Sequence, residues 1–212
     1  MNGIRHALRA VILVGLTAIT VNSLAKPEAI AFEAGPVSPS SLGIAQASSI
    51  SSGTILREIN RLRSNPAAYA DWLETTRSYY DGAVLSWPRQ PRIQTQEGTY
   101  ALDEAIAILR QTPSLPPLEL SDGLTRAADD HVKDLLENNR FSTAGSDGST
   151  SENRIERYGF YEGDFQELLS QDLADPVAIV MGLVVNDGNS TRSYRQALLK
   201  ADFRYIGIAI RG

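Results

Sequence analysis

The chain has 212 residues, no cysteine, and 20 basic against 25 acidic residues, which gives a net charge of −5 at pH 7. The absence of cysteine excludes disulfides, thiol nucleophiles and a lipid-modified cysteine. No cluster of lysine and arginine stands out in this acidic chain. This argues against a nucleic-acid partner, because such partners usually require a basic surface.

The first 25 residues have the pattern of a secretory signal peptide. Arg5 and Arg9 give a positive start, residues 10–21 are apolar apart from two threonines, and small residues then allow cleavage after Ala25 or Ala31. This apolar run is too short for a comfortable membrane span of about 20 residues, and no later stretch is long enough. We therefore expect secretion to the extracellular space or periplasm, with no transmembrane span in the mature protein. An uncleaved N-terminal anchor is the alternative.

Removal of residues 1–25 leaves 18 basic and 25 acidic residues, a net charge of −7. Residues 26–52 are rich in Ala, Ser, Pro and Gly and are expected to form a flexible spacer. Residues 53–212 are expected to form one globular domain, large enough to be held by its core without disulfides. A strand that ends at the last residues, with no hairpin partner after it, is consistent with a natural chain that continues past Gly212.

Two helical segments are predicted in the first half of this domain. Apolar residues recur at helical spacing over 54–74, and Pro66 starts a new helix or kinks this one, with Asn65 placed as its cap. Residues 81–98 hold two prolines and two glycines and are expected to form an irregular excursion. A second helical segment is predicted over 101–110.

The second half alternates helices and strands. Ser121 is expected to cap a helix through Asn138, followed by a polar turn region at 142–152 and a short helical turn at 154–158. Residues 165–169 are expected to form a short strand.

An aspartate cap followed by a proline at 175–176 predicts a helix through Val185 that is apolar almost all round and is ended by residues 186–188. Ser190 or Thr191 is expected to cap a last helix through Lys200. Residues 205–211 alternate in the manner of a strand.

The number of histidines limits metal chemistry. The chain holds two histidines, and the predicted removal of His6 leaves His131 alone. A zinc site built on two or more His or Cys ligands is therefore impossible within one mature chain. Two segments, Asp147-Gly148-Ser149 and Asp187-Gly188-Asn189, carry oxygen ligands suited to calcium but lack the EF-hand spacing. Ordinary Asx turns are the favoured interpretation of both.

His131 and Glu167 are the titratable residues of most interest. His131 would have to be the base of any Ser-His-Asp triad, but it lies on the apolar stripe of its helix, which favours a core histidine with one hydrogen-bond partner. Glu167 lies between apolar neighbours and is expected to be partly buried, so it needs a partner.

Two arginines, Arg192 and Arg195, lie one turn apart near the start of the last helix. They are placed to share an acidic partner or an anionic ligand, or else to belong to a solvated helix face. Tyr194 between them is expected to point inward.

Several motifs in chain order resemble bacterial CAP-domain proteins, the SCP-like extracellular family. The segments Asn60–Arg63 and Asn65–Ala70 resemble that family's opening helix, and Ala127–His131 resembles its next helix. Residues 145–149, with Arg154 and Tyr158-Gly159, resemble the loop before the central sheet. Residues 187–188, Arg192-x-x-Arg195 and 203–209 resemble the closing helix and strand, so the resemblance covers roughly 53 to 212.

This resemblance implies an α+β fold, a three-layer α-β-α sandwich with a small antiparallel central sheet flanked by helices. It also implies a central cleft, in which typical members carry two histidines and two acids that can hold a divalent metal. Thr143 and Tyr194 stand at the two histidine positions here, and Glu167 stands where the family motif has its glutamate. The resemblance therefore implies a degenerate cleft without a metal or other cofactor.

We expect a binding module for a small amphiphile, a glycan or a surface protein. The expected cleft residues are Thr143, Glu167 and Tyr194, with Arg192 and Arg195 beside them. One alternative is a hydrolase that uses Glu167 as its general base. Another is a structural cell-surface protein with a vestigial cleft.

Overall fold

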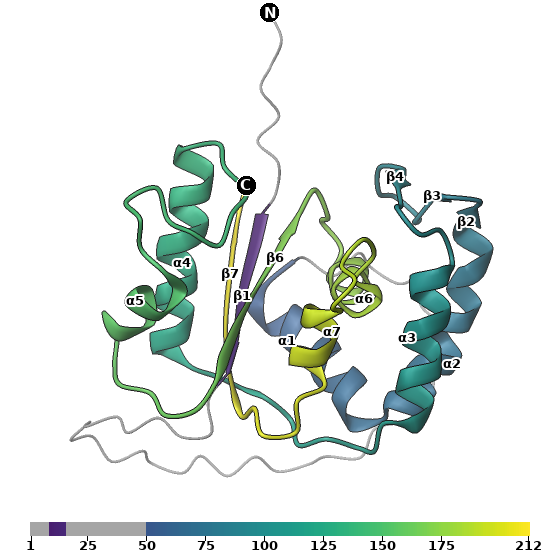
Figure 1. Cartoon of the computed structure of the whole chain (residues 1–212), viewed down its shortest axis with the longest axis horizontal. Coiled ribbons are helices and arrows are strands. Elements are labelled where there is room, and N and C mark those ends of the chain that lie inside the picture. The colour runs from purple at the N-terminus through teal and green to yellow at the C-terminus, as the bar shows by residue number, and fades with distance from the viewer. Residues whose placement is uncertain (1–8, 16–49) are drawn as a thin grey trace, which may run out of the picture.

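A computed structural model describes residues 9–15 and 50–212 of the chain (Figure 1). The predicted cleavage positions, and most of the predicted spacer at 26–52, lie outside the described residues. The last residues of that spacer, Ser51 and Ser52, cap and begin the first helix.

The opening helical segment consists of two helices, so Pro66 starts a new helix and does not kink a continuous one. Helix α1 (Ser52–Ser64) ends where α2 (Pro66–Thr75) begins. The side chain of Asn65 accepts a hydrogen bond of 3.1 Å from the Ala68 amide, while Pro66 takes the first helical position, where a missing amide hydrogen costs nothing.

The next segment contains more regular structure than the sequence predicts. A 3-10 turn, η1 (Thr76–Tyr79), leads into a three-stranded sheet of β2 (Tyr80–Asp81), β3 (Val84–Leu85) and β4 (Ile93–Gln94). The prediction of an irregular excursion over 81–98 is wrong here, because strands of two residues are too short to show alternation. Helix α3 (Tyr100–Gln111) follows at its predicted place.

Helix α4 covers one face of the main sheet. The short strand β5 (Glu119–Leu120) precedes α4 (Asp122–Glu137), and the Ser121 side chain caps the helix by accepting from the Leu124 amide, as predicted. Helix α5 (Ser151–Glu156) begins three residues before the expected helical turn, because Thr150 caps it together with Asn153. Strand β6 (Phe165–Gln171) extends two residues beyond its prediction.

Helix α6 (Pro176–Val185) begins with the predicted Asp175 cap. Asn186, with a φ of 53°, makes the left-handed exit that ends it. All but two of its residues are buried, in agreement with the prediction of a sandwiched helix.

Helix α7 (Ser193–Leu198) is shorter than predicted and has a different cap. Neither Ser190 nor Thr191 caps it; Arg192 takes the cap position with a φ of 52° and no side-chain capping bond. Strand β7 (Tyr205–Arg211) is present as predicted.

The main sheet has the strand order β5-β7-β1-β6. Strand β1 (Arg9–Gly15) lies between β6 and β7 and is antiparallel to both over its whole length, whereas β5 is parallel to β7. Residues 10–15, the first part of the apolar run predicted to belong to a signal peptide, thus lie in an inner strand of the main sheet. Their removal by cleavage stays a prediction.

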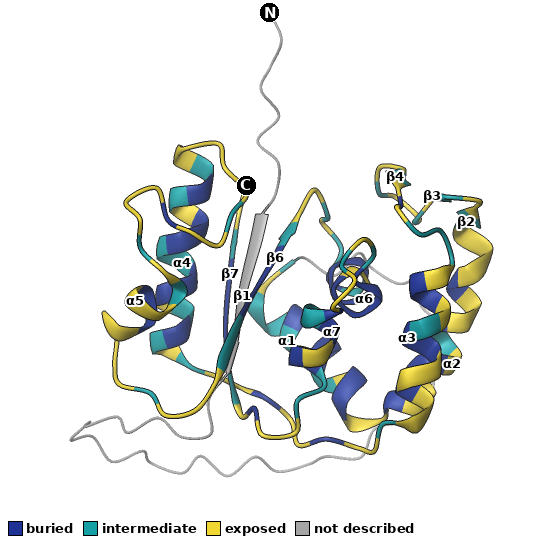
Figure 2. Cartoon of the chain, viewed as in Figure 1, coloured by how far each residue is buried: buried dark blue, intermediate teal, exposed yellow. Residues whose placement is uncertain are grey.

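Helices cover both faces of this sheet, which confirms the α-β-α sandwich (Figures 1 and 2). One core lies between the sheet and α1, α6 and α7 and extends to α2 and α3; its sheet residues are Leu168, Ile206 and Ile208. The other lies between the sheet and α4 and α5, with Leu169 and Ala209. Alternate residues of one strand therefore serve opposite cores.

Gly207 allows α4 to lie directly on the sheet. A Cβ atom at this position would lie 2.2 Å from the carbonyl carbon of Leu124. Only glycine permits such a close approach of helix and strand backbones.

Candidate functional site

Glu167 lies on β6 at the centre of a buried polar cluster. Its side chain is 2% exposed, and both carboxylate oxygens are engaged. Arg154 from α5 donates from Nη2 to both oxygens, at 3.2 and 2.9 Å, and is also 2% exposed. Ser151 donates its hydroxyl to Oε2 at 2.7 Å. The buried charge therefore has a charge-assisted partner.

His131 of α4 completes this cluster, which we call the Glu167 centre (Ser151, Arg154, Glu167 and His131). Its Nδ1 lies 2.7 Å from Glu167 Oε1, and its ring is fully buried. This confirms a core histidine with one hydrogen-bond partner. Among residues 9–15 and 50–212, none offers a hydrogen-bond partner to its Nε2 atom.

Thr143 and Tyr194 border the Glu167 centre in different ways. Thr143 is exposed and contributes only its carbonyl oxygen, which accepts from Arg154 Nη2 at 2.9 Å. Tyr194 is half-buried; burial and the nearby Glu167 charge raise the pKa of its hydroxyl, while a hydrogen bond from the Leu169 backbone partly offsets this. Tyr194 thus covers a backbone group of β6, the edge strand of the sheet.

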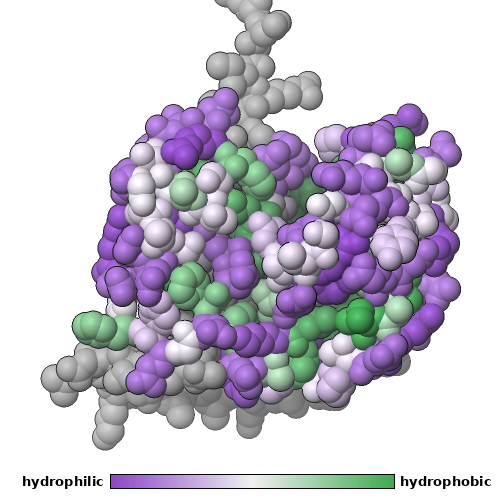
Figure 3. Space-filling model, in the orientation of Figure 1, coloured by the Kyte–Doolittle hydropathy of each residue, from purple (hydrophilic) through white to green (hydrophobic). Residues whose placement is uncertain are grey.

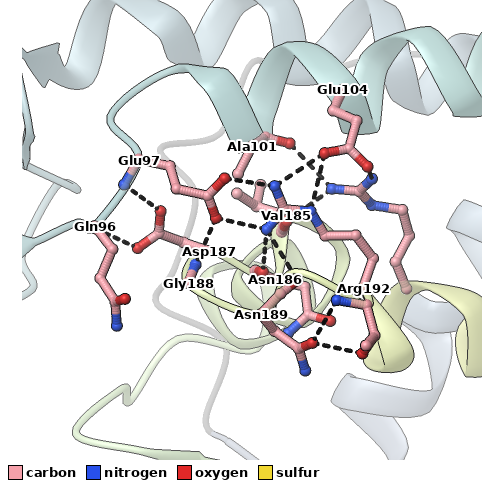
Figure 4. A network of polar contacts seen from close by, with 12 residues as sticks. Gln96, Glu97, Ala101, Glu104, Val185, Asn186, Asp187, Gly188, Asn189 and Arg192 are labelled. Carbon is pink, nitrogen blue, oxygen red and sulfur yellow. Dashed lines mark hydrogen bonds and ion pairs between the residues drawn. The ribbon is translucent and has the colours of Figure 1, made fainter.

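Arg192 and Arg195 belong to a second cluster, and they share an acidic partner. Arg195 Nη1 bonds to one oxygen of Glu104 and Arg192 Nε to the other, both at 2.9 Å (Figure 4). Arg192 also binds both oxygens of Glu97 at 2.6 Å. Both arginines are buried, so the protein's own carboxylates take the place that an anionic ligand would need.

This second cluster joins the loop before α3 to the turn between α6 and α7. Asp187 in that turn accepts from the amides of Gln96 and Glu97, at 2.7 and 2.9 Å, and Gly188 donates to Glu97 at 2.8 Å (Figure 4). The hydrogen bonds from Arg192 and Gly188 lower the pKa of Glu97 to about 2. The cluster fixes the two segments against each other.

The first of the two possible calcium segments is an Asx turn. Asp147 accepts from the Ser149 amide at 2.8 Å, and hydrogen bonds from the Ser149 hydroxyl and amide lower the pKa of Asp147 to about 2. Among the described residues, no group of three or more His, Asp or Glu side chains is arranged to hold a metal ion.

An open groove lies beside the start of α4 and is walled by aromatic residues. It encloses about 480 Å³, and its wall brings together four rings from the α5–β6 loop and β7: Tyr158, Phe160, Tyr161 and Tyr205. Phe160 is 86% exposed, a large value for a phenylalanine. We call this the aromatic groove.

The tyrosine hydroxyls of the groove are tied to neighbouring acids. Tyr158 donates to Asp130 and Tyr161 to Glu152, both at 2.8 Å. Burial and the Glu152 bond raise the pKa of Tyr161 to about 12. Phe165 meets the Tyr161 ring edge to face, with 5.5 Å between centroids. These contacts fix the orientation of the Tyr158 and Tyr161 rings.

A second hollow lies over β6 and α7. It encloses about 430 Å³ and is lined by Phe165 and Gln166 of β6 with Ser193 and Gln196 of α7, among others. On the face shown in Figure 3, hydrophobic side chains gather between the α4–α5 layer and α6–α7, with polar ones around them.

Comparison with known families identifies the family to which this domain belongs. The family model described as "CAP: Cysteine-rich secretory protein family" matches residues 56–212. The chain belongs to the CAP family. No curated protein and no solved structure matched it. This CAP domain contains no cysteine, despite the family's description.

The Glu167 centre does not fit a divalent metal ion. The Arg154 guanidinium, a fixed positive charge, already bonds to both oxygens of Glu167. Threonine and tyrosine stand at the positions that the resemblance assigns to metal-binding histidines. His131 Nδ1 is directed at the carboxylate. We derive no metal chemistry for this centre.

The sequence-predicted site residues thus fall into two clusters. Thr143, Glu167 and Tyr194 meet around the Glu167 centre, and Arg192 and Arg195 take part in the Glu97–Glu104 network. Sequence reasoning missed Ser151 and the aromatic groove. The three closely spaced aromatic residues Tyr158, Phe160 and Tyr161 were the signal for the groove.

Proposed function

We propose that this CAP domain is an extracytoplasmic binding module that takes a small amphiphile in the aromatic groove. The observation that carries this is the exposure of Phe160 beside three other rings that line the same hollow. Aromatic surface left open around a hollow is typical of ligand sites.

The composition of the groove favours an amphiphile over a purely apolar ligand. Leu120, Leu124 and Ile155 supply apolar floor between the rings, while Arg126 and Asp122 stand among the lining residues. Arg126 is exposed, so its guanidinium is available to an anionic headgroup. The apolar part of the ligand would lie against the rings, as expected for a pocket with few polar groups.

The geometry supports binding better than hydrolysis by Glu167. A general base must reach the proton that it abstracts. The Glu167 carboxylate is 2% exposed and accepts from Ser151 and Arg154. We assign the Glu167 centre, with Thr143 and Tyr194, a supporting role behind the ligand site.

Export is part of the same proposal. The family's description names secretory proteins, and no helix of residues 50–212 has the length and apolarity needed to cross a membrane. We propose a bacterial protein whose residues 1–25 act as the signal peptide. The N-terminal residue of the exported protein, read by mass spectrometry, distinguishes cleavage after Ala25 or Ala31 from an uncleaved anchor.

Calorimetric titration of the purified protein with dodecanoate tests the proposed ligand class. We expect saturable binding that weakens roughly ten-fold in Phe160→Ala, because a lost aromatic contact costs about 1.5 kcal/mol. Phe141→Ala is the matched control, since Phe141 is 48% exposed but does not line the groove. Equal effects of the two substitutions would refute the groove as the site.

A charge reversal tests the headgroup. Arg126→Glu should weaken the binding of dodecanoate and strengthen that of dodecyltrimethylammonium, which has the same chain length and the opposite charge. Parallel changes for both probes would mean that Arg126 does not contact the headgroup.

A further inference from the structure

The place of β1 in the sheet defines a gap that a strand must fill. Within the main sheet, β6 pairs with β1 alone, through seven residue pairs from Arg9–Gln171 to Gly15–Phe165. Strand β7 pairs with β1 over seven residues on the other side. Without a strand in this position, β6 has no sheet partner and both flanking strands present unpaired backbone groups.

This strand slot, bounded by Phe165–Gln171 and Tyr205–Arg211, is covered on both faces. On one face, Leu168 and Ile208 belong to the core formed with α1 and α6. On the other, Leu169 and Ala209 belong to the core formed with α4. A strand buried on both faces must be apolar at nearly every position, not at every second one.

Outside the helices and the two flanking strands, the sequence of 212 residues holds one such segment. Residues 10–14 read Ala-Val-Ile-Leu-Val, an uninterrupted apolar run that occupies the five inner positions of the seven-residue strand Arg9–Gly15. In the predicted spacer, the longest such run is Ala29–Phe32, and it is flanked by Glu28 and Glu33. The long apolar run at 177–185 is already part of α6.

We propose that the strand slot is a peptide-binding site that takes an extended apolar strand of about seven residues, antiparallel to both β6 and β7. Arg9–Gly15 fills it in the uncleaved chain. The inference rests on the proposed export in one respect, since removal of residues 1–25 would free the slot for another apolar strand. Backbone pairing would supply the affinity and the two cores the preference for apolar side chains.

The register of the strand predicts which residues the slot would not accept at each position. Position 13 of the strand pairs with Glu167 on one side and Gly207 on the other, and both are buried. A carboxylate at this position would pair with the buried Glu167 carboxylate, an unfavourable contact between like charges. Position 12 lies at the middle of the strand, where a proline would remove a ladder hydrogen bond.

The test uses the full chain with a specific protease site inserted in the predicted spacer, so that it does not depend on export. The chain is folded, cut, and challenged with an excess of an isotope-labelled peptide of residues 5–16. We expect the native N-terminal fragment to remain bound after cutting and to exchange for the labelled peptide in native mass spectrometry. Peptides with Leu13→Asp or Ile12→Pro should bind roughly 100-fold more weakly.

Hydrogen exchange at the amides of 165–171 and 205–211 gives the second readout. Bound peptide should protect both strands, and the Ile12→Pro peptide should not. The proposal would be overturned if the N-terminal fragment dissociated after cutting while the amides of 165–171 and 205–211 stayed equally protected from exchange. Pairing of two cut domains without peptide, with both strands protected, would assign the slot to a second copy and would also overturn it. Failure of dodecanoate binding at the aromatic groove would leave these outcomes unaffected.

Discussion

At the residue scale, the buried charges are explained by their partners. Glu167 and Arg154 are both 2% exposed and bond to each other. Removing one member of such a pair leaves an uncompensated buried charge, whereas replacing both by apolar residues of similar size need not destabilise the fold. The pair is therefore a test of the supporting role assigned to the Glu167 centre.

We expect Glu167→Gln to lower the free energy of unfolding by about 3 kcal/mol, because Arg154 keeps its charge without a counter-charge. The double variant Glu167→Leu with Arg154→Met should be more stable than Glu167→Gln. Urea unfolding followed by circular dichroism measures both. A double variant that is less stable than Glu167→Gln would contradict this explanation.

The ionisation of Glu97 should make the stability of the folded protein depend on pH in the acid range. Its pKa is lowered from 4.5 to about 2 in the folded protein by Arg192 and Gly188, so its contribution is fully present above pH 4.5 and is lost as the pH falls through 2. The melting temperatures of the protein and of Glu97→Gln should therefore differ at pH 6 and converge towards pH 2. Glu119→Gln, an exposed change in β5, is the control. A difference that persists unchanged at pH 2 would contradict the assigned pKa.

At the element scale, Gly207 permits the contact between α4 and β7. We expect Gly207→Ala to destabilise the protein by about 3 kcal/mol, since the added carbon would meet the Leu124 backbone. Gly182→Ala in α6 is the matched control: the nearest atom to the added Cβ, Leu173 Cδ1, would lie 3.7 Å away, and alanine there should stabilise by about 0.5 to 1 kcal/mol. Thermal unfolding measures both variants. Changes in melting temperature of the same sign would contradict the close approach of α4 and β7.

Local signals predicted most elements correctly. Asn65, Ser121 and Asp175 each cap the helix that the sequence assigns to them, because capping is a local preference of the side chain and its neighbours. The predicted cap of α7 was wrong: Arg192 takes a left-handed backbone conformation there while its side chain binds Glu97 and Glu104, some 90 residues away. Local reasoning does not detect such distant partners.

The site was predictable to a similar extent. The apolar neighbours of Glu167 predicted its burial and its need for a partner, and the stripe of α4 predicted that His131 is a core residue. That these two residues bind each other, with Arg154, depends on how α4, α5 and β6 meet. The spacing of residues along the sequence does not show how these three elements pack together.

At the scale of the whole molecule, the fold places three distinct features around one sheet. The Glu167 centre lies between β6 and the helices α4 and α5, the Arg192–Glu97–Glu104 network ties α3 to the α6–α7 turn, and the aromatic groove opens beside α4. The CAP family match extends over all three. Of these three features of the described residues, only the aromatic groove combines exposed aromatic surface with an open volume. For this reason we propose it as the ligand-binding site.

A hydrogen-exchange footprint of the protein saturated with dodecanoate tests this assignment most directly. We predict new protection in 120–126 and 158–161 and at Tyr205, the segments that line the aromatic groove. Protection confined instead to Thr143, 165–169 and 193–196, around the Glu167 centre and α7, would contradict the assignment.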